Sequence, residues 1–501
     1  MSNHEHELLG LGELKLSESG LSLPIDVQAP TEQPAPQTIT PEDIAALAAV
    51  EAELESRFSE VEIDPTLERM QLLMDLLGNP ERAFPSIQVA GTNGKTSTVR
   101  MIESLMRAFH RRTGRTTSPH LQSVTETIAI DGLPIHPRDY VRIWEEIKPY
   151  VEMVDAQSIA KGGPKLSKFE IRTALAYAAF ADAPVDVAIV EVGMGGSWDA
   201  TNVIQADVAV VTPVGLDHQG FLGETLAEIA TQKAGIIKQR WDLDDLLSPP
   251  DNVAIIGLQE PDALRAILEH AVTTDAAVAR AGIEFGLVSG GIAVGGQQVT
   301  IRGLAGEYPD IFIPLAGEHQ AHNAANALAA VEAFFGAGPG RSLDLDTVKQ
   351  GFATVVNPGR LERVRTAPTV FIDAAHNPHG AKALGAALSR DFDFSRMIGV
   401  VAILGDKDVR GILQALEPYL QEIVVTQNTS PRALPVEELE EYAREIFGDE
   451  RVHTAHNLLG AVELAVELAE DTDIQSGAGV IITGSVVTAG EARTLMGKEP
   501  Q

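Results

Sequence analysis

The spacing of apolar residues predicts strands that alternate with helices along most of the chain. Four apolar runs have the length of strands, and they are SIQVA at 86–90, DVAIVEVG at 186–193, ADVAVVTPVG at 206–215 and NVAIIGL at 252–258. Runs this apolar are typical of strands buried on both faces of a parallel sheet, with helices between them in sequence. The first part of the chain is therefore predicted to be an α/β unit.

Helix signals accompany these strands. Thr40, Pro41, Glu42 and Asp43 predict a helix that begins at Pro41, with Thr40 as its N-cap and two acidic residues in its first turn. A second helix is expected over 66–77. The glycine-rich alternation at 285–303 instead predicts a hairpin.

A cluster of glycine and proline at 334–348 follows a long alanine-rich stretch and is the predicted domain boundary. Beyond it the strand pattern starts again in TVFIDAAH, MIGVVAIL, EIVVTQ and GVIITGS, with helical sequence between them. We expect an N-terminal P-loop-type doubly wound α/β domain at 41–338 and a smaller C-terminal Rossmann-like α/β domain at 339–501. In such sheets, ligands bind at the carboxyl ends of the strands.

Composition narrows the possible functions. The chain has 501 residues, too many for one ordinary domain, and a formal net charge of −33. This charge argues against nucleic-acid or anionic-membrane partners, because both demand a basic face. The absence of cysteine excludes disulfides and thiolate sites, and no apolar run reaches eighteen residues. We expect a cytoplasmic protein whose acidic residues 1–40 form a disordered tail.

The stretch VAGTNGKTST at 89–98 carries the strongest chemical signal. It follows an apolar strand and opens a helix, so backbone amides and the positive end of the helix dipole can meet a phosphate. Lys95 would neutralise phosphate charge, and Thr96 would cap the helix or face a metal. A full P-loop has glycine five places before Gly94, where this chain has Val89. A nucleotide site of an unusual class is predicted.

Three later positions in the first unit could carry chemistry. Glu191 ends an apolar strand ahead of three glycines, so it could hold Mg²⁺ or simply cap a helix. Asp217 and His218 follow the next strand, although a lone histidine is usually structural. Lys233 lies in QKAGIIK, where apolar neighbours could bury the amine and lower its pKa enough for it to react, although a helix lysine is usually solvated.

Two clusters later in the chain predict that the second unit closes over the nucleotide. His319 and Asn323 open the alanine-rich helix, and Arg360, Asp373 and His376 lie near the domain junction. Arginine is a natural clamp for transferred phosphate, and an aspartate at a strand end suits ribose hydroxyls. Each of these residues could instead be a structural hydrogen bonder.

As a set, these motifs resemble one family, the Mur ligase superfamily, and within it the folylpolyglutamate synthase/dihydrofolate synthase branch. The resemblance runs from Ile44 to Met496, and its motifs are GTNGKT, SPHL, EVGMGG with DATN, LDH with LG, KAGIIK, HNAANAL, GRLE and D-x-AHNP. The missing first glycine is normal in this family. The resemblance therefore implies an ATP-dependent amide ligase rather than a kinase or GTPase.

The resemblance also implies roles for residues that bind ATP and metal. ATP would be bound by Gly91, Thr92, Asn93, Gly94, Lys95, Thr96, Asn323, Arg360, Asp373 and His376. Two magnesium ions would be held by Ser118, Glu191 and His218. Lys233 would be carbamylated and act as a carboxylate-like metal partner. The catalytic residues would be Lys95, His218, Lys233 and Arg360.

For the pterin, the resemblance implies two segments, and their residues are Ser167, Lys168, Phe169, Glu170, Trp198, Asp199 and Ala200. The family commonly has arginine directly after the double glycine, where this chain has Ser197. The charge arrangement at the pterin or carboxylate end is therefore expected to differ from that of the family.

The implied reaction joins L-glutamate to a folate-type carboxylate. That carboxylate would attack the γ-phosphate of ATP, and the glutamate amine would displace phosphate from the acyl phosphate, with no protein nucleophile. Dihydropteroate and reduced folates are both implied acceptors, so we expect a bifunctional enzyme. We also expect a monomer, with a monovalent cation as a further candidate cofactor.

Three alternatives stay open. The enzyme could use reduced folates alone, or it could be another Mur-type amino-acid ligase. A UDP-sugar substrate is disfavoured, because only the tail and two helices precede the glycine loop. The chain could also be a nucleotide-binding module without turnover, but the joint presence of Glu191, His218 and Lys233 argues against that.

Overall fold

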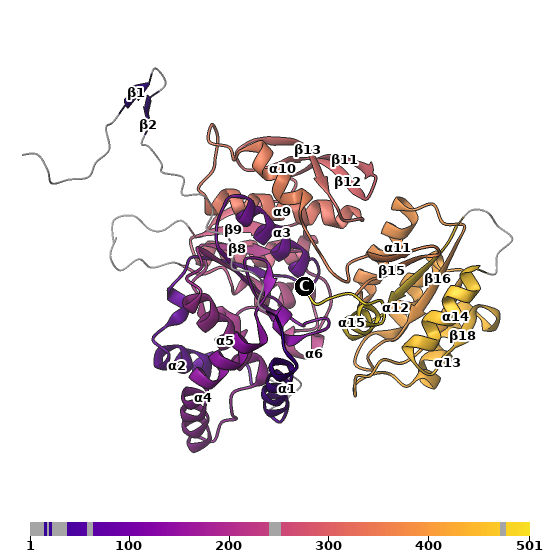
Figure 1. The fold of residues 1–501 in the computed structure, drawn as a ribbon. Helices are drawn as coiled ribbons and strands as arrows, with labels where there is room; N and C mark the ends of the chain where they lie inside the picture. Colours follow the sequence, from indigo (N-terminus) through magenta and orange to yellow (C-terminus); the bar gives the residue numbers. More distant parts are fainter. Residues whose placement is uncertain (1–14, 18–19, 23–37, 58–63, 240–251, 471–476) are drawn as a thin grey trace, which may run out of the picture.

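The computed structural model describes residues 15–17, 20–22, 38–57, 64–239, 252–470 and 477–501. Figure 1 shows two α/β domains side by side. Most of the tail expected at 1–40 lies outside the described residues, apart from two short antiparallel strands, β1 (Lys15–Ser17) and β2 (Gly20–Ser22).

An eight-stranded sheet forms the centre of the first domain, in the order β10-β9-β8-β3-β7-β4-β5-β6. It is parallel from β10 to β4, whereas β5 and β6 are antiparallel, so the sheet is mixed. The four predicted strands are confirmed as β3 (Ser86–Ala90), β7 (Val187–Glu191), β8 (Val208–Val211) and β9 (Val253–Ile256). The others are β4 (Thr113–Thr116), β5 (Ile128–Ile130), β6 (Leu133–Pro134) and β10 (Ala277–Arg280).

Helices cover both faces of this sheet, which confirms the doubly wound prediction. One face carries α3 (Lys95–Ala108), α9 (Glu318–Phe334) and α10 (Leu345–Ala353). The other carries α1 (Pro41–Glu55), α2 (Glu68–Leu76), α4 (Pro137–Ala160), α5 (Lys168–Asp182), α7 (Leu226–Ala234) and α8 (Pro261–Thr273). Successive residues of β7 point to opposite faces of the sheet: Ile189 belongs to the core beneath α3 and α9, and Val190 to the core beneath α4 and α5.

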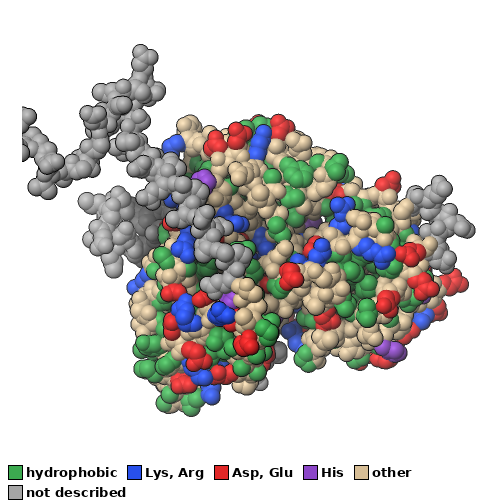
Figure 2. Space-filling view, viewed as in Figure 1, with side chains coloured by type: hydrophobic (Ala, Val, Ile, Leu, Met, Phe, Trp, Pro, Cys, Tyr) green, Lys and Arg blue, Asp and Glu red, His purple; other side chains and the backbone are tan. Residues whose placement is uncertain are grey.

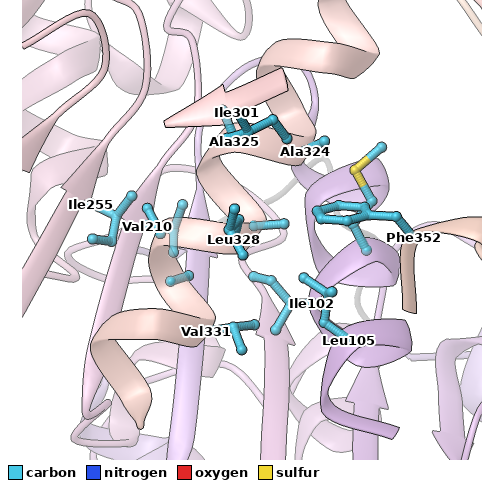
Figure 3. Packing of buried hydrophobic residues seen from close by; sticks show 14 of the residues in the cluster. Ile102, Leu105, Val210, Ile255, Ile301, Ala324, Ala325, Leu328, Val331 and Phe352 are labelled. Atoms are coloured by element: carbon cyan, nitrogen blue, oxygen red, sulfur yellow. The ribbon is translucent and has the colours of Figure 1, made fainter. Parts of the chain in front are cut away.

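The core on the α3 side fixes the helix that carries the glycine loop. Figure 3 shows Leu328 of α9 between Val210 of β8 and Phe352 of α10, with Ile102 and Leu105 of α3 beside them. All five side chains are fully buried. Because close-packed cores resist displacement, α3 presents its N-terminus to the cleft from a fixed position.

The hairpin predicted at 285–303 is confirmed and extended by a third strand. β11 (Gly286–Ala293), β12 (Gly296–Arg302) and β13 (Glu307–Ile313) form an antiparallel sheet that packs on α9. Helix α10, which follows the predicted boundary at 338/339, packs against α3 and β13 of the first domain.

The second domain contains a six-stranded sheet in the order β14-β15-β19-β16-β17-β18, parallel except for β14. Its strands are β14 (Glu362–Thr366), β15 (Thr369–Ile372), β16 (Arg396–Val401), β17 (Glu422–Val425), β18 (Val452–Thr454) and β19 (Ala478–Thr483). One face packs against α11 (Pro378–Asp391), α12 (Val409–Leu416) and α13 (Val436–Phe447). The other packs against α14 (Leu458–Glu470) and α15 (Val486–Leu495).

Acidic and basic side chains are interspersed over the face of the molecule drawn in Figure 2. The longest helix of the described residues, α4, packs with α1, α2 and α5 rather than standing alone. No helix in the described ranges is both long and apolar enough to span a membrane.

Candidate active site

A cleft of about 320 Å³, open to solvent, lies between the two domains. The first domain lines it with the glycine loop, with Glu191 at the end of β7, and with Ser118 and Asp217, which follow the ends of β4 and β8. The second domain contributes Arg360, Asp373 and His376, and α9 contributes His319 and Asn323. The structure therefore brings together the residues predicted to bind nucleotide and metal.

The backbone of the glycine loop passes too close to its neighbours to carry larger residues. A Cβ atom on Gly91 would lie 1.9 Å from Oγ1 of Thr212, and one on Gly94 would lie 2.5 Å from Oδ1 of Asn323. Gly94 also has a φ of +86° as the N-cap of α3, a conformation that favours glycine. The amides of Thr92 and Asn93 donate to the backbone oxygen of Pro213 at 3.0 and 3.3 Å and hold the loop in place. The first amides of α3, from Lys95 on, are then the ones positioned to meet a phosphate at the helix N-terminus.

Lys95 points back over this loop, where its Nζ donates to the backbone oxygen of Thr92 at 3.3 Å. Burial lowers the pKa of Lys95, and the nearby carboxylate of Glu191 opposes that effect. In the described part of the chain, no carboxylate forms an ion pair with Lys95 or with Arg360. Both cations are therefore free to meet phosphate oxygens.

Glu191, at the end of β7, provides the best metal ligand of the cleft. Its Oε1 accepts from the Thr96 hydroxyl at 2.9 Å, whereas its Oε2 is buried and has no hydrogen-bond partner in the described structure. Burial raises the pKa of this carboxyl, against the opposing charge of Lys95. A buried carboxylate oxygen without a donor is costly, and a bound cation would satisfy it.

Ser118 and His218 line the same cleft as Glu191. His218 precedes the short helix α6 (Gln219–Leu222), and burial lowers its pKa to about 4, so its imidazole is neutral and able to bind a metal at pH 7. Among the described residues, no three His, Asp or Glu side chains form a ready-made metal cage. A magnesium ion held here would need phosphate oxygens and water to complete its six ligands.

Lys233 of α7 is buried beneath the glycine loop. Its side chain is about 5% exposed, and its Nζ donates to the backbone oxygen of Gly91 at 2.8 Å. Burial, assisted by the charge of Lys95, lowers its pKa to about 7. Near neutral pH a large fraction of this amine is therefore uncharged, which is the form that attacks electrophiles.

Asp373 orders the loop that carries Arg360. Its two carboxylate oxygens accept from the backbone amides of Leu361 and Ala375, each at 2.8 Å. His376 contacts the backbone oxygen of Ala374 through Nδ1 at 2.9 Å, and burial lowers its pKa to about 4. The motifs GRLE at 359–362 and D-x-AHNP at 373–378 therefore form one structure at the domain junction.

The two segments expected to bind the pterin flank the glycines that follow Glu191. A Cβ on Gly193 would lie 2.4 Å from the ring of Phe169, and one on Gly195 would lie 3.3 Å from the ring of Trp198. Asp199 accepts from the amide of Met194 at 2.8 Å and holds this turn. Gly193 and Met194 line the cleft. The residues expected to bind the pterin are not among its lining residues, and they are Ser167, Lys168, Phe169, Glu170, Trp198, Asp199 and Ala200.

Sequence reasoning missed residues of the second domain that reach across the cleft. Nζ of Lys407 lies 3.5 Å from Oδ1 of Asp217, and Nδ1 of His379 lies 2.9 Å from the side-chain nitrogen of Asn93. Lys407 follows the end of β16 in the sequence LGDKD, and a charged cluster after an apolar strand was the signal that could have identified it. Ser197, in contrast, is exposed and donates to the backbone oxygen of Gln232 at 3.2 Å.

Comparison with known proteins extends over both domains. Residues 89–333 match the family model of the Mur ligase middle domain, and residues 359–486 match that of the Mur ligase glutamate ligase domain. A dihydrofolate synthase/folylpolyglutamate synthase of Mycobacterium tuberculosis is 57% identical over 473 residues, which are 92% of this chain and 96% of that protein. One of Escherichia coli is 32% identical over 403 residues, 80% of this chain and 87% of that protein.

Solved structures give the same result. A folylpolyglutamate synthase of M. tuberculosis complexed with ADP and AMPPCP superposes with a TM-score of 0.86 at 56% identity, over 92% of this chain and 100% of that one. The FolC protein of E. coli in complex with DHPP and ADP gives a TM-score of 0.76 at 29% identity, over 91% and 99%.

Proposed function

The chain belongs to the Mur ligase family, in its dihydrofolate synthase/folylpolyglutamate synthase branch, and we propose how its residues perform the reaction of that branch. It is an ATP-dependent glutamate ligase with both activities. One observation carries the proposal: the glycine loop of one domain and Arg360 and His376 of the other line the same cleft. Both halves come from one chain, so we propose that the enzyme works as a monomer, in the cytoplasm.

The glycine loop and Lys95 would bind the phosphates of ATP, with Asn323 behind the loop at Gly94. The acceptor carboxylate attacks the γ-phosphorus, and ADP leaves, so that an acyl phosphate forms. Arg360, which has no carboxylate partner in the described residues, would stabilise the charge that builds on the transferred phosphoryl group. The amine of L-glutamate then attacks the acyl carbon, phosphate leaves, and an amide remains.

Glu191, Ser118 and His218 would hold magnesium, because the unpartnered Oε2 of Glu191 and the neutral imidazole of His218 suit a cation. When bound, Mg²⁺ shields the charge of the phosphate oxygens. Lys233, once carbamylated by CO₂, would present a carboxylate instead of an ammonium beside this set. A monovalent cation stays a further candidate.

The pterin would be bound beside the cleft by Phe169 and Trp198, whose rings pack against the backbone of Gly193 and Gly195. Arg69 supports this wall, because its Nε donates to the Glu170 carboxylate at 3.2 Å inside the protein. We propose that Ser197, exposed where the family commonly has arginine, leaves the rim of this site without a fixed positive charge.

The test is phosphate release from MgATP with L-glutamate and, in separate reactions, dihydropteroate and tetrahydrofolate, with products identified by mass. Glutamate-dependent release with both acceptors is expected. Release with tetrahydrofolate alone would restrict the enzyme to folylpolyglutamate synthesis, and the absence of release with both would contradict the proposal. A Lys95→Ala variant is the control for release by contaminating ATPases.

A further inference from the structure

The loop between β4 and the following 3-10 turn, residues 117–123, carries Ser118 at one end and contacts the second domain at the other. Its base is tied to the first domain, since the amide of Thr117 donates to the backbone oxygen of Thr127 at 3.1 Å. The carboxylate of Glu126 accepts from the amide of Leu121 at 2.7 Å. The side chains of Leu121 and Gln122 are left to face α15.

Gln122 uses its whole amide group for the second domain. Its nitrogen donates to the backbone oxygen of Lys498 at 2.7 Å and to the hydroxyl of Thr494 at 3.2 Å. Its oxygen accepts from Arg493, which is about 1% exposed and also pairs with Glu362 at 2.9 Å. A buried arginine with both a charged and an amide partner is held in one orientation.

Leu121 is also held by the second domain, through close packing and not through hydrogen bonds of its side chain. Its side chain packs with the α15 core of the second domain, and its backbone oxygen touches Gly490 so closely that a Cβ there would lie 1.8 Å away. Nearby, Arg100 of α3 donates to the backbone oxygen of Gln501 at 2.6 Å. Figure 1 shows α15 on the side of the second domain that faces the first, with the C-terminal end of the chain between the two domains.

We infer that α15 and the residues after it set the position of the Ser118 loop, so that the second domain completes the metal side of the cleft as well as the phosphate side. Gln122 and Arg493 are then positioning residues. They bind no ligand themselves, and they act on Ser118 through the four-residue stretch from 118 to 121. This inference rests on the magnesium site proposed above.

The variants that test it are Gln122→Ala and Gly490→Ala in the full chain. Gln122→Ala removes the hydrogen bonds of the Gln122 side chain to the second domain and leaves the Arg493–Glu362 pair intact. Gly490→Ala inserts a methyl group against Leu121. The matched controls are Gln350→Ala, an exposed glutamine on α10, and Gly460→Ala, a helical glycine of α14 whose Cβ would meet only Oδ1 of Asn457, at 3.5 Å.

ADP binding is measured by calorimetry at a series of Mg²⁺ concentrations, together with the Mg²⁺ dependence of phosphate release. Both test variants are expected to need about tenfold more Mg²⁺ for the half-maximal effect, as for other residues that support metal ligands, with ADP affinity in EDTA unchanged. The two controls should match the wild type in both measurements.

Two results would overturn the inference, and they are distinguishable. Test variants that lose thermal stability or rate at an unchanged Mg²⁺ midpoint would assign these contacts to packing alone. If Gly490→Ala fails to fold, Gln122→Ala still decides the matter. A wild-type protein whose ADP binding and turnover ignore Mg²⁺ would remove the proposed metal site itself, and with it the inference.

Discussion

At the scale of single residues, the buried amine of Lys233 is the group whose proposed role can be tested in the most ways. Lys233→Ala should lower turnover by two orders of magnitude or more and leave ATP affinity within about threefold, because the amine lies beneath the loop and touches it only through one backbone oxygen. Phosphate release and calorimetry measure the two quantities. Lys161→Ala, on an exposed lysine, is the control.

Carbamylation of Lys233 can be observed directly. A ¹³C carbamate signal should appear with ¹³C-bicarbonate in the wild type and be missing from Lys233→Ala. Equal rates of wild type and variant would remove the proposed role of the carbamate.

The same residue makes stability depend on pH. Its pKa is about 7 in the folded protein and 10.5 ordinarily, so between these values the unfolded chain binds a proton that the folded chain does not. The free energy of unfolding should therefore rise with pH across this window, by at most about 1.4 kcal/mol per pH unit from this group. Below pH 7 both states are protonated, and the contribution is constant.

Lys233→Met should reduce this rise without abolishing it, because burial also lowers the pKa of Lys95 and of Lys238. The measurement is denaturant unfolding at pH 7, 8 and 9 in CO₂-free buffer, with Lys161→Met as the control that keeps the wild-type slope. Parallel curves for the wild type and Lys233→Met would show that the amine titrates near its ordinary pKa.

At the scale of elements, the N-terminus of α5 positions the proposed pterin wall. The Ser167 hydroxyl accepts from the amide of Glu170 at 3.2 Å, and the Glu170 carboxylate accepts from the amide of Ser167 at 2.8 Å. Ser167→Ala should cost about 1 kcal/mol of stability and raise the KM for dihydropteroate severalfold. Thr40→Ala removes the capping box of α1 and should cost a similar amount with no change in KM. If Ser167→Ala and Thr40→Ala had the same effect on the KM, the N-terminus of α5 would have no role in substrate binding.

The predictability of the elements follows from where their apolar residues lie. β3, β7, β8 and β9 are buried on both faces, so their sequences are apolar runs. β4 has the sequence TGRT and gives no such signal, because its Arg115 is fully buried against Glu103 at 2.6 Å. Only the tertiary structure supplies that partner, and single-sequence periodicity therefore missed the strand that leads to Ser118.

The site was predictable to the same extent. Glycines, Lys95 and the strand-end residues follow one another in short motifs, so their proximity can be read from the sequence order. The pairing of Lys407 with Asp217 joins residues from different domains, and the hydrogen bonds of Asp373 turn that side chain toward its own loop. Neither arrangement leaves a pattern in the neighbouring sequence from which it could be predicted.

At the scale of the whole molecule, polar contacts such as those of Asn93 with His379 and of Asp217 with Lys407 bridge the cleft, and these should respond to ligands. Small-angle scattering should show a smaller radius of gyration with an ATP analogue and dihydropteroate together than without them, since interfaces of this kind permit domain motion. An unchanged radius with both ligands bound would contradict closure of the two domains. The segment at 334–348, where this closure was expected from the sequence, lies between α9 and α10, and both helices pack in the first domain.

The ion pair between Lys407 and Asp217 provides the sharpest test of how that closure is coupled to catalysis. Burial alone would raise the pKa of Asp217, but the neighbouring His218 and Lys407 hold this pKa below its ordinary value. The carboxylate is therefore charged at pH 7. Both side chains are under 15% exposed, at 12% and 14%, and removal of one leaves the other charge poorly compensated. Lys407→Ala should lower kcat/KM on the order of tenfold and reduce the ligand-induced change in radius.

The control is Arg432→Ala, which breaks an exposed pair with Asp406 inside the second domain, at 49% and 44% exposure. Exposed pairs contribute little, so this variant should behave as the wild type in rate and in scattering. If Lys407→Ala also matched the wild type in both, the contact would be an incidental consequence of the closed arrangement. If it lowered the rate but left the change in radius intact, Lys407 would act on the reacting groups and not on closure.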